Sequence, residues 1–124
     1  MFIQKKRYKV LKKSKLTYKQ IHDDLGLANV LRAIGELEMH TGNKDEAEKH
    51  FKDAEDVYRC IHSDLGLANT LILRGELEMY KGNVDKAQKH LEKAEDVYRQ
   101  IRSAIGLSIA LLTKGNLEMY KEAI

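Results

Sequence analysis

Apolar residues recur along this chain at the intervals that place them on one side of a helix. A stripe of small and large apolar residues, spaced by three or four positions, runs through the middle of the sequence: Ala47, Phe51, Ala54, Tyr58 and Ile61. Because an α-helix completes a turn about every 3.6 residues, these side chains share one face. The segment from about residue 24 to residue 40 has similar intervals: Leu27, Leu31, Ile34 and Met39. Two helices are therefore expected between residues 24 and 61.

This pattern repeats every 40 residues. Residues 18–57 and 58–97 are identical at 25 of 40 aligned positions, and a third copy begins at Tyr98. All eight glycines stand at positions that recur at this interval: Gly26, Gly66 and Gly106; Gly35, Gly75 and Gly115; Gly42 and Gly82. An internal period of this length is typical of helical repeat proteins.

Turn and capping residues separate the two helices of each repeat. Gly42 stands where a glycine commonly ends a helix. Asn43 then provides an N-cap for the second helix, with Glu46 three residues later as its capping-box partner. Asp23–Asp24 and Ser63–Asp64 supply polar caps where a second helix is followed by the next first helix. Each repeat is thus expected to be a helical hairpin.

We expect one array over residues 1–124, built from about six helices. It begins with an unpaired second-type helix at residues 5–21, followed by repeat 1 at 22–61, repeat 2 at 62–101, and a partial repeat 3 at 102–124 with a first helix only. A hairpin cannot bury its apolar stripe alone, so neighbouring hairpins must stack on each other. The predicted fold class is all-α: a right-handed α-solenoid of antiparallel helix hairpins.

The spacing of these residues resembles the signature of the tetratricopeptide repeat (TPR), in which small residues pack the hairpin. The matching positions are Leu31, Gly35, Gly42, Ala47, Phe51 and Ala54, then Leu71, Gly75, Gly82, Ala87, Leu91 and Ala94. The resemblance covers nearly the whole chain after residue 17, and the 40-residue period resembles the extended repeats of Pins-, rapsyn- and kinesin-light-chain-like proteins. The chain departs from the signature late in the first helix, because Glu38, Glu78 and Glu118 stand where an aromatic residue is usual.

The resemblance implies a binding function, since the partners of TPR proteins lie along an inner groove lined by the first helices. The corresponding positions are Asn29, Arg32, Glu36, His40, Asn69, Ile72, Glu76, Tyr80, Leu112 and Asn116. Asparagine offers a donor and an acceptor to the backbone of an extended peptide, and Arg32 suits a carboxylate or a phosphate. In the alternative interpretation, Asn29 and Asn69 bridge neighbouring helices. The expected function is a protein–protein interaction scaffold that binds a peptide or protein segment.

The ends of the chain favour a second hypothesis, a self-assembling structural module. The first helix lacks a partner, and the last repeat stops after its first helix. The apolar residues expected to be uncovered at these ends are Val10, Leu11, Ile109, Leu112, Leu117 and Met119. A homo-oligomer is therefore expected, with a dimer favoured because a two-fold pairing closes.

Charge is unevenly distributed. Residues 1–20 hold eight Lys or Arg and no acid, whereas the remaining residues carry 14 basic and 19 acidic side chains. A basic helix can bind nucleic-acid phosphates or an anionic membrane surface. We interpret it instead as the outer face of a helix whose apolar side packs on the array through Val10, Leu11, Leu16 and Ile21. Neither nucleic acid nor a membrane is the expected partner.

No pattern indicates an enzyme. The five histidines and the recurring acidic pairs (Glu36/Glu38, Glu55/Asp56, Glu95/Asp96) follow the repeat, and we interpret them as helix-surface residues in solvent. No catalytic residue, metal site, cofactor or small-molecule substrate is expected. Cys60 is the single cysteine, which is typical of a reducing compartment. No apolar run approaches the roughly 20 residues that span a bilayer, so a cytoplasmic location is expected.

Overall fold

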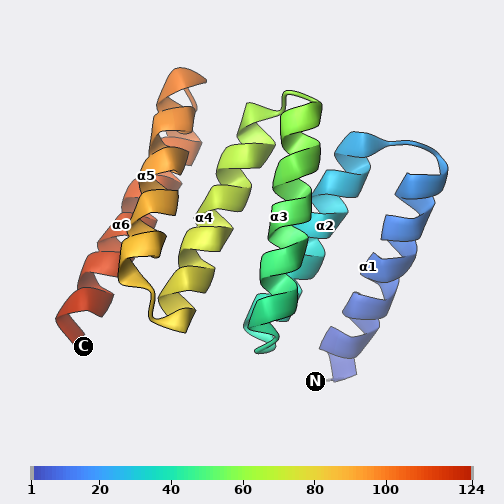
Figure 1. Cartoon of the computed structure of the whole chain (residues 1–124), viewed down its shortest axis with the longest axis horizontal. Coiled ribbons are helices and arrows are strands. Elements are labelled where there is room, and N and C mark those ends of the chain that lie inside the picture. Colours follow the sequence, from blue (N-terminus) through green and yellow to red (C-terminus); the bar gives the residue numbers. More distant parts are fainter. Residues whose placement is uncertain (1, 124) are drawn as a thin grey trace. The chain divides into compact units, whose positions relative to one another are not determined.

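The chain is all-helical. The computed structural model describes residues 2–123, apart from the side chain of Phe2, and within this range it has six α-helices and no β-strand (Figure 1). The helix bounds are Phe2–Gln20 (α1), Asp24–His40 (α2), Lys44–Cys60 (α3), Asp64–Lys81 (α4), Val84–Gln100 (α5) and Ala104–Ala123 (α6). The predicted all-α fold with about six helices is confirmed. Met1 and Ile124, the two ends of the predicted array, lie outside the described residues.

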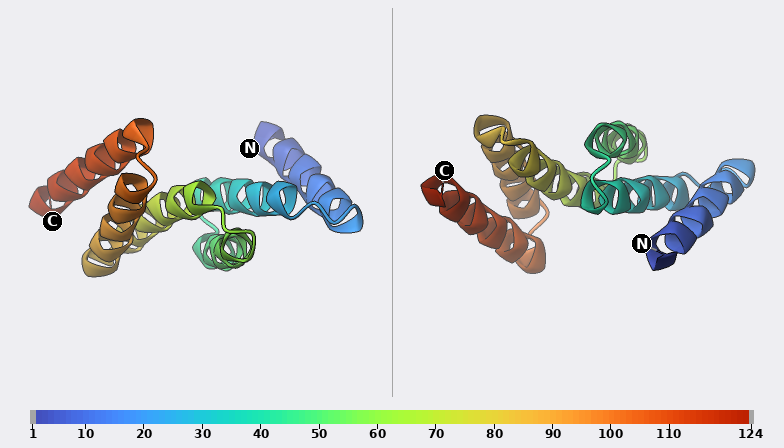
Figure 2. Two further views of the ribbon diagram at one scale, coloured as in Figure 1. Left: turned by 90° about the horizontal axis from the view of Figure 1, so that it is seen from above. Right: turned by 90° about the horizontal axis from the view of Figure 1, so that it is seen from below.

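The helices form two compact units, one ending at Ser63 and the other beginning at Asp64. In the first unit, α2 packs against both α1 and α3; in the second, α5 packs against both α4 and α6, and α4 also contacts α6. Successive helices of a unit run in opposite directions (Figure 1), and the short turns from α2 to α3 and from α5 to α6 can be followed in Figure 2. Each unit therefore contains an antiparallel hairpin of the predicted kind. The right-handed winding of one array stays a prediction.

Glycines end the first helices of both complete repeats. Gly42 and Gly82 have φ angles of +89° and +82°, in the left-handed region that glycine adopts without steric penalty. Beyond α2, the amide of Asn43 donates to the carbonyl of Glu38 over 2.8 Å, as in the Schellman motif. The predicted capping box is wrong, because the Asn43 side chain does not cap α3. Its Nδ2 lies instead 3.5 Å from Thr41 Oγ1.

Polar side chains cap the beginnings of α2 and α6. Asp23 Oδ1 accepts a hydrogen bond of 2.8 Å from the amide of Gly26, and Ser103 Oγ accepts one of 3.0 Å from the amide of Gly106. Such bonds satisfy amides that have no acceptor within the helix. The cap predicted at Asp23 is confirmed, and Ser103 repeats it in the last repeat.

The apolar stripe of each second helix forms the centre of its unit's core. The buried stripe residues are Ala47, Phe51, Ala54 and Tyr58 on α3, and Ala87, Leu91, Ala94 and Tyr98 on α5. Glycines allow the facing helix to come close: a Cβ atom added to Gly35 on α2 would lie 2.6 Å from Cε1 of Phe51. A Cβ atom added to Gly75 on α4 would likewise lie 2.6 Å from Cδ2 of Leu91. The predicted packing of hairpins through small residues is confirmed.

The face of α1 that packs on α2 differs from the predicted one. Three of the four residues predicted to pack are exposed: Val10, Leu16 and Ile21. The contact is made by Tyr8 and Tyr18, which are half-buried. Leu11, which lies between them in the sequence, is half-buried as well. The Tyr18 ring occupies the space beside Gly26 that a side chain there would need, and the Tyr8 hydroxyl reaches into α2. Tyrosine buries a large ring while its hydroxyl keeps a polar partner, so these two rings orient the helix.

Candidate interaction surfaces

Along α2, the residues predicted to line a groove lie partly in solvent and partly in the contact with α3. Asn29, Glu36 and His40 are exposed, and Arg32 is half-buried. Asn29 Oδ1 accepts a hydrogen bond of 2.5 Å from the hydroxyl of Tyr58 on α3. Burial raises the pKa of Tyr58, and the neighbouring Arg32 guanidinium partly offsets that rise. The oxygen of Asn29 therefore holds α2 against α3.

Asn69 repeats this arrangement in the second unit. Its Oδ1 accepts a hydrogen bond from the hydroxyl of Tyr98 on α5. Of the two interpretations of these asparagines, the structure shows helix bridging in both repeats. Replacing either asparagine by alanine leaves a tyrosine hydroxyl without its acceptor, which costs about 1–3 kcal/mol. Asparagine variants would thus change stability as well as binding.

A small hollow in the second unit brings three of the predicted groove residues together. Glu76 and Tyr80 extend from α4 and Asn116 from α6, and Met79 and Thr113 complete the lining. The volume of the hollow is about 190 Å³. Tyr80 is half exposed, so its ring is open to solvent at this edge. Residues from two successive repeats therefore share one surface.

Two other predicted groove residues do not line this hollow. Ile72 is 5% exposed and belongs to the apolar core of the second unit together with Leu91, so its assignment to the groove is wrong. Its position on α4, three residues before Gly75, turns it towards the packed side of the helix. Leu112 is 68% exposed on α6.

Most residues predicted to be uncovered for self-association are exposed. They are Val10, Ile109, Leu112 and Met119, with Leu11 half-buried. Leu117 is the correction: it is 1% exposed and lies in the core of the second unit with Ala94 and Tyr98. It stands on the side of α6 that packs into the unit, so the expectation that it is uncovered is wrong. The homodimer stays a prediction.

Acidic residues predicted to lie in solvent are buried instead. Glu38 on α2 is 1% exposed, and its two carboxylate oxygens have different partners. The hydroxyl of Tyr8 on α1 donates to Oε2 over 2.8 Å, and Nδ1 of His50 on α3 lies 2.6 Å from Oε1. Burial and the hydrogen bond to Glu38 raise the pKa of Tyr8 to about 12. One carboxylate thus ties α1 and α3 to α2.

The same correction applies to Glu55 and Glu95, which are also buried. Glu78, the equivalent of Glu38 in the second repeat, is buried as well. Glu55 pairs with Arg59 at 3.3 Å, and Glu78 accepts a hydrogen bond of 2.7 Å from Asn83. Every buried side-chain nitrogen and oxygen in the described part of the chain has a hydrogen-bond partner, as the cost of burying polar groups requires. The sequence held one signal for Glu38 and Glu78, since both stand where the TPR signature that the repeats resemble has an aromatic residue. Glu118 stands at the same position of the third repeat, but its side chain is 65% exposed.

The histidines differ in part from their predicted place on helix surfaces. His22 and His62 lie in the turns before α2 and α4, with φ angles of 56° and 57° in the left-handed region. The side chain of His50 is only 15% exposed because it packs on the buried carboxylate of Glu38. His40, at the end of α2, is exposed as predicted.

Glu95 links α5 to α6. Lys114 Nζ on α6 and Arg99 Nη2 on α5 each lie 2.8 Å from a carboxylate oxygen of Glu95. The hydrogen bond from Lys114 lowers the pKa of Glu95 below its ordinary value of 4.5. Because the folded pKa is the lower of the two, this stabilisation is present above about pH 4.5 and is lost as the pH falls through the folded pKa.

Replacing Lys114 by methionine is expected to lower the free energy of unfolding by about 1 kcal/mol at pH 7, a modest loss because the lysine is partly exposed. The difference from the wild-type chain should shrink as the pH is lowered from about 5 to about 3, since Glu95 then loses its charge. Urea denaturation at a series of pH values measures both quantities. A difference of equal size at pH 7 and in acid would contradict the assigned ion pair.

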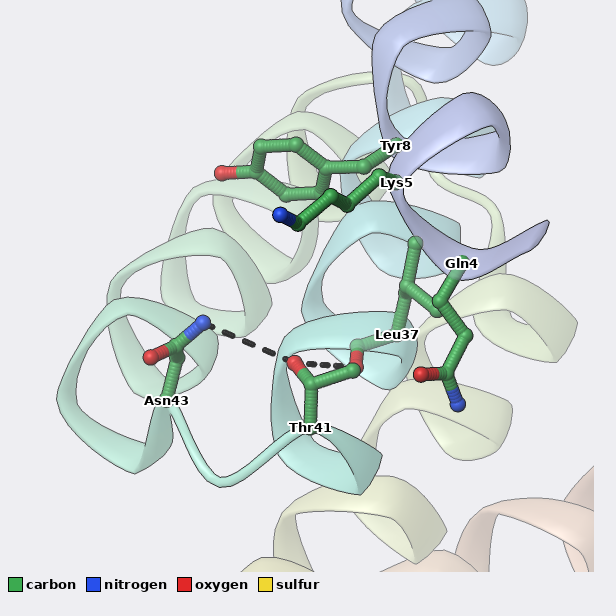
Figure 3. Close-up of a pocket in the computed structure, with 6 residues that line it drawn as sticks. All are labelled: Gln4, Lys5, Tyr8, Leu37, Thr41 and Asn43. Atoms are coloured by element: carbon green, nitrogen blue, oxygen red, sulfur yellow. Dashed lines mark hydrogen bonds between the residues drawn. The ribbon is translucent and has the colours of Figure 1, made fainter. Parts of the chain in front are cut away.

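A larger pocket, which the sequence did not predict, lies in the first unit (Figure 3). Its volume is about 310 Å³. The lining residues come from α1, from the end of α2 and from the turn that follows: Gln4, Lys5, Tyr8, Leu37, Thr41 and Asn43. Figure 3 shows Lys5 and Tyr8 extending side by side from α1, and Thr41 Oγ1 donating to the carbonyl of Leu37 over 3.0 Å. This pocket is separate from the predicted groove residues.

The described residues include neither a cluster of metal-binding side chains nor a membrane-spanning helix. Between residues 2 and 123, no group of three or more His, Cys, Asp or Glu side chains is arranged to hold a metal ion. Over the same range, none of the helices combines the length and the apolar character needed to cross a membrane.

Comparison with known proteins identifies no family for this chain. No protein-family model matches it, and no curated protein sequence gives a significant match. The TPR resemblance therefore rests on the residues and their 40-residue spacing alone, and it stays a hypothesis.

Proposed function

We propose that this chain is a TPR-like module that binds a protein or peptide segment along its first helices, without a catalytic role. The observation that carries the proposal is the hollow between α4 and α6, where three residues that the TPR resemblance assigns to the groove lie together: Glu76, Tyr80 and Asn116. The single cysteine, Cys60, is exposed and has no cysteine partner in the chain. A free cysteine of this kind is typical of proteins in a reducing compartment such as the cytoplasm, which is the location we propose.

The chemistry of the hollow favours a lysine or arginine side chain of the partner. Glu76 supplies a carboxylate at the wall, which suits a cation. The Tyr80 ring and the Met79 thioether offer apolar and polarisable surface to the aliphatic stem of such a side chain. Asn116 adds an amide that can bond to the partner's backbone. A volume of about 190 Å³ holds one side chain, whereas sites for small-molecule ligands are commonly about 300 Å³ or more.

Selection from a random peptide library displayed on phage tests this function. Peptides retained by the wild-type chain are expected to be enriched in Lys and Arg. A labelled peptide from that selection should bind the Glu76→Gln, Asn116→Ala double variant about tenfold more weakly in fluorescence anisotropy, because a buried charge-assisted contact is worth about 1.5–3 kcal/mol.

Asp96→Asn is the matched control for the loss of charge. Asp96 is an exposed acid on α5, so this variant removes the same charge away from the hollow and should bind as the wild type does. Circular dichroism must show that all variants keep their helices. Selected peptides that bind the double variant as tightly as the wild-type chain would rule out the α4–α6 hollow as the binding surface.

A further inference from the structure

Helices α4 and α6 are both first helices of a repeat, and they carry similar apolar surfaces. The surface is covered on α4 and exposed on α6. On α4, Leu71, Ile72 and Gly75 are buried. The residues 40 positions after the first two, Leu111 and Leu112 on α6, are 49% and 68% exposed. The chain therefore carries nearly the same apolar surface twice in the second unit, once packed and once open.

Gly115 lies at the centre of the open surface. In the two complete repeats, the space above the equivalent glycine, here called the glycine socket, receives a large side chain of the next helix: Phe51 above Gly35 and Leu91 above Gly75. A Cβ atom added to Gly115 meets no atom within 4 Å. The same socket is thus filled in two repeats and open in the third.

The open surface lies across the helix from the side that holds α6 in its unit. Ala110 and Leu117 are buried, and at about 100° per residue they stand on the opposite side from Gly115. An occupant of the Gly115 socket would therefore not have to displace α6. A helix face that meets only water is normally polar, whereas this one presents Leu111 and Leu112.

The helices that fill the equivalent sockets define the chemistry of an occupant. Both carry the pattern Ala-x-x-His-(Phe or Leu)-x-x-Ala, at residues 47–54 and 87–94. The large apolar residue enters the socket, and the alanines let the two helices approach closely. In the first unit the histidine, His50, reaches the carboxylate of Glu38 over 2.6 Å. Glu118 stands at the equivalent position of α6.

We propose that the open surface of α6 binds an amphipathic helix of a partner, with this pattern of small, basic and large apolar residues. The surface consists of Leu111, Leu112, Gly115, Glu118 and Met119. The partner's large apolar residue fills the Gly115 socket, its flanking alanines face Leu111 and Met119, and its histidine or another cation meets Glu118. This surface is separate from the α4–α6 hollow, so the two proposals stand or fall independently.

The α1 helix of a second copy does not fit this surface. Leu11 stands 40 positions before Phe51 and would be the residue to enter the socket. However, Arg7 stands 40 positions before Ala47 and 80 before Ala87, which are both fully buried against the facing helix. A guanidinium at that closely packed position would lose its hydration without gaining a partner. The occupant is therefore a helix with alanine at this position.

A synthetic peptide with the sequence of residues 83–101, which contains α5, is the probe for this surface. In fluorescence anisotropy, the labelled peptide is expected to bind the full chain. A peptide with Leu91→Ala should bind about tenfold or more weakly, because it cannot fill the socket. Circular dichroism of the mixture should show a gain of helix over the sum of the separate components, since most of the stability of a helix in a protein comes from packing of its apolar face, which the free peptide lacks.

Two variants of the full chain make the test specific. Gly115→Leu fills the socket from within and is expected to abolish binding while leaving the fold intact, because no atom lies within 4 Å of the added Cβ. Leu25→Ala removes an exposed apolar side chain of α2 and is the control, which should bind the peptide as the wild type does.

Three results overturn the proposal. If the peptide binds the Gly115→Leu chain as well as the wild type, it has displaced α5 or bound another surface. If it does not bind at concentrations up to about 1 mM, the surface has no affinity for such a helix. If sedimentation equilibrium shows that the wild-type chain self-associates, that Gly115→Leu abolishes the association, and that the peptide does not compete, the occupant is a second copy.

Discussion

Replacing Gly35 by alanine is expected to lower the free energy of unfolding by about 1–3 kcal/mol. The added methyl group would lie 2.6 Å from Cε1 and 2.7 Å from Cδ1 of the Phe51 ring, which is rigid and fully buried. Helices α2 and α3 must therefore separate along the contact that forms the core of the first unit. This loss outweighs the gain of roughly 1 kcal/mol that alanine brings to a helix interior relative to glycine.

Gly115→Ala is the matched control, because it makes the same change at the same position of the third repeat. No atom lies within 4 Å of the added methyl group. The helix-propensity gain then acts alone, and the free energy of unfolding is expected to rise by up to about 1 kcal/mol. Urea denaturation followed by circular dichroism measures both variants. Effects of the same sign and size at the two glycines would contradict the packing described for Gly35.

A Phe51→Leu background tests the cause of the Gly35 effect. Leu91 fills the equivalent space above Gly75 in the second unit, and a leucine methyl can turn aside more easily than an aromatic ring. The cost of Gly35→Ala should therefore be smaller in this background. We expect a coupling free energy of about 1 kcal/mol in the double-mutant cycle. Strict additivity would show that the ring is not the obstacle.

Replacing Glu38 by alanine is expected to lower the free energy of unfolding by about 2–4 kcal/mol. The change removes the acceptor of the Tyr8 hydroxyl and the partner of His50, at 2.8 Å and 2.6 Å, and it leaves a void in a buried site. Urea denaturation at pH 7 measures the loss. Because Tyr8 joins α1 to α2, trypsin should also cleave the lysine-rich α1 sooner in the variant than in the wild-type chain.

Glu118→Ala is the control for this prediction. Glu118 occupies the same repeat position on α6, but its side chain is 65% exposed and lies 3.0 Å from Lys121 Nζ in an exposed ion pair. Such surface changes usually alter stability by less than about 0.5 kcal/mol. If Glu118→Ala destabilised the chain as much as Glu38→Ala, the buried hydrogen bonds of Glu38 would not explain its effect.

The positions of the helices could be predicted from the sequence because local interactions determine where a helix begins and ends. The segment predicted from about residue 24 to 40 is α2, Asp24–His40. It begins where the Asp23 side chain caps an amide three residues away and ends where Gly42 adopts a positive φ angle. The cap and the glycine turn each depend only on residues within about one turn of the helix. They are therefore expected in every repeat that carries the same residues.

The α4–α6 hollow was predicted only in part. The TPR resemblance implied that Glu76, Tyr80 and Asn116 line the groove, and the structure brings these three together. The same resemblance implied that Ile72 lies there, although it is buried in the core. Periodicity predicts which residues share one side of a helix. Periodicity does not predict how many sides of a helix are covered by neighbours. Helix α4 contacts both α5 and α6, so more than one of its sides is covered.

The burial of repeat-equivalent residues was decided by the tertiary structure. Sequence alone treats Glu38 and Glu118 as the same position, and likewise Gly35 and Gly115. Glu38 is buried because Tyr8, 30 residues earlier, and His50, 12 residues later, reach its carboxylate from two other helices. Gly115 is open because no helix among the described residues packs above it. Helix formation depends on residues a few positions apart, whereas burial depends on which distant segment packs on a face, and the 40-residue repeat by itself does not distinguish between equivalent positions in this respect.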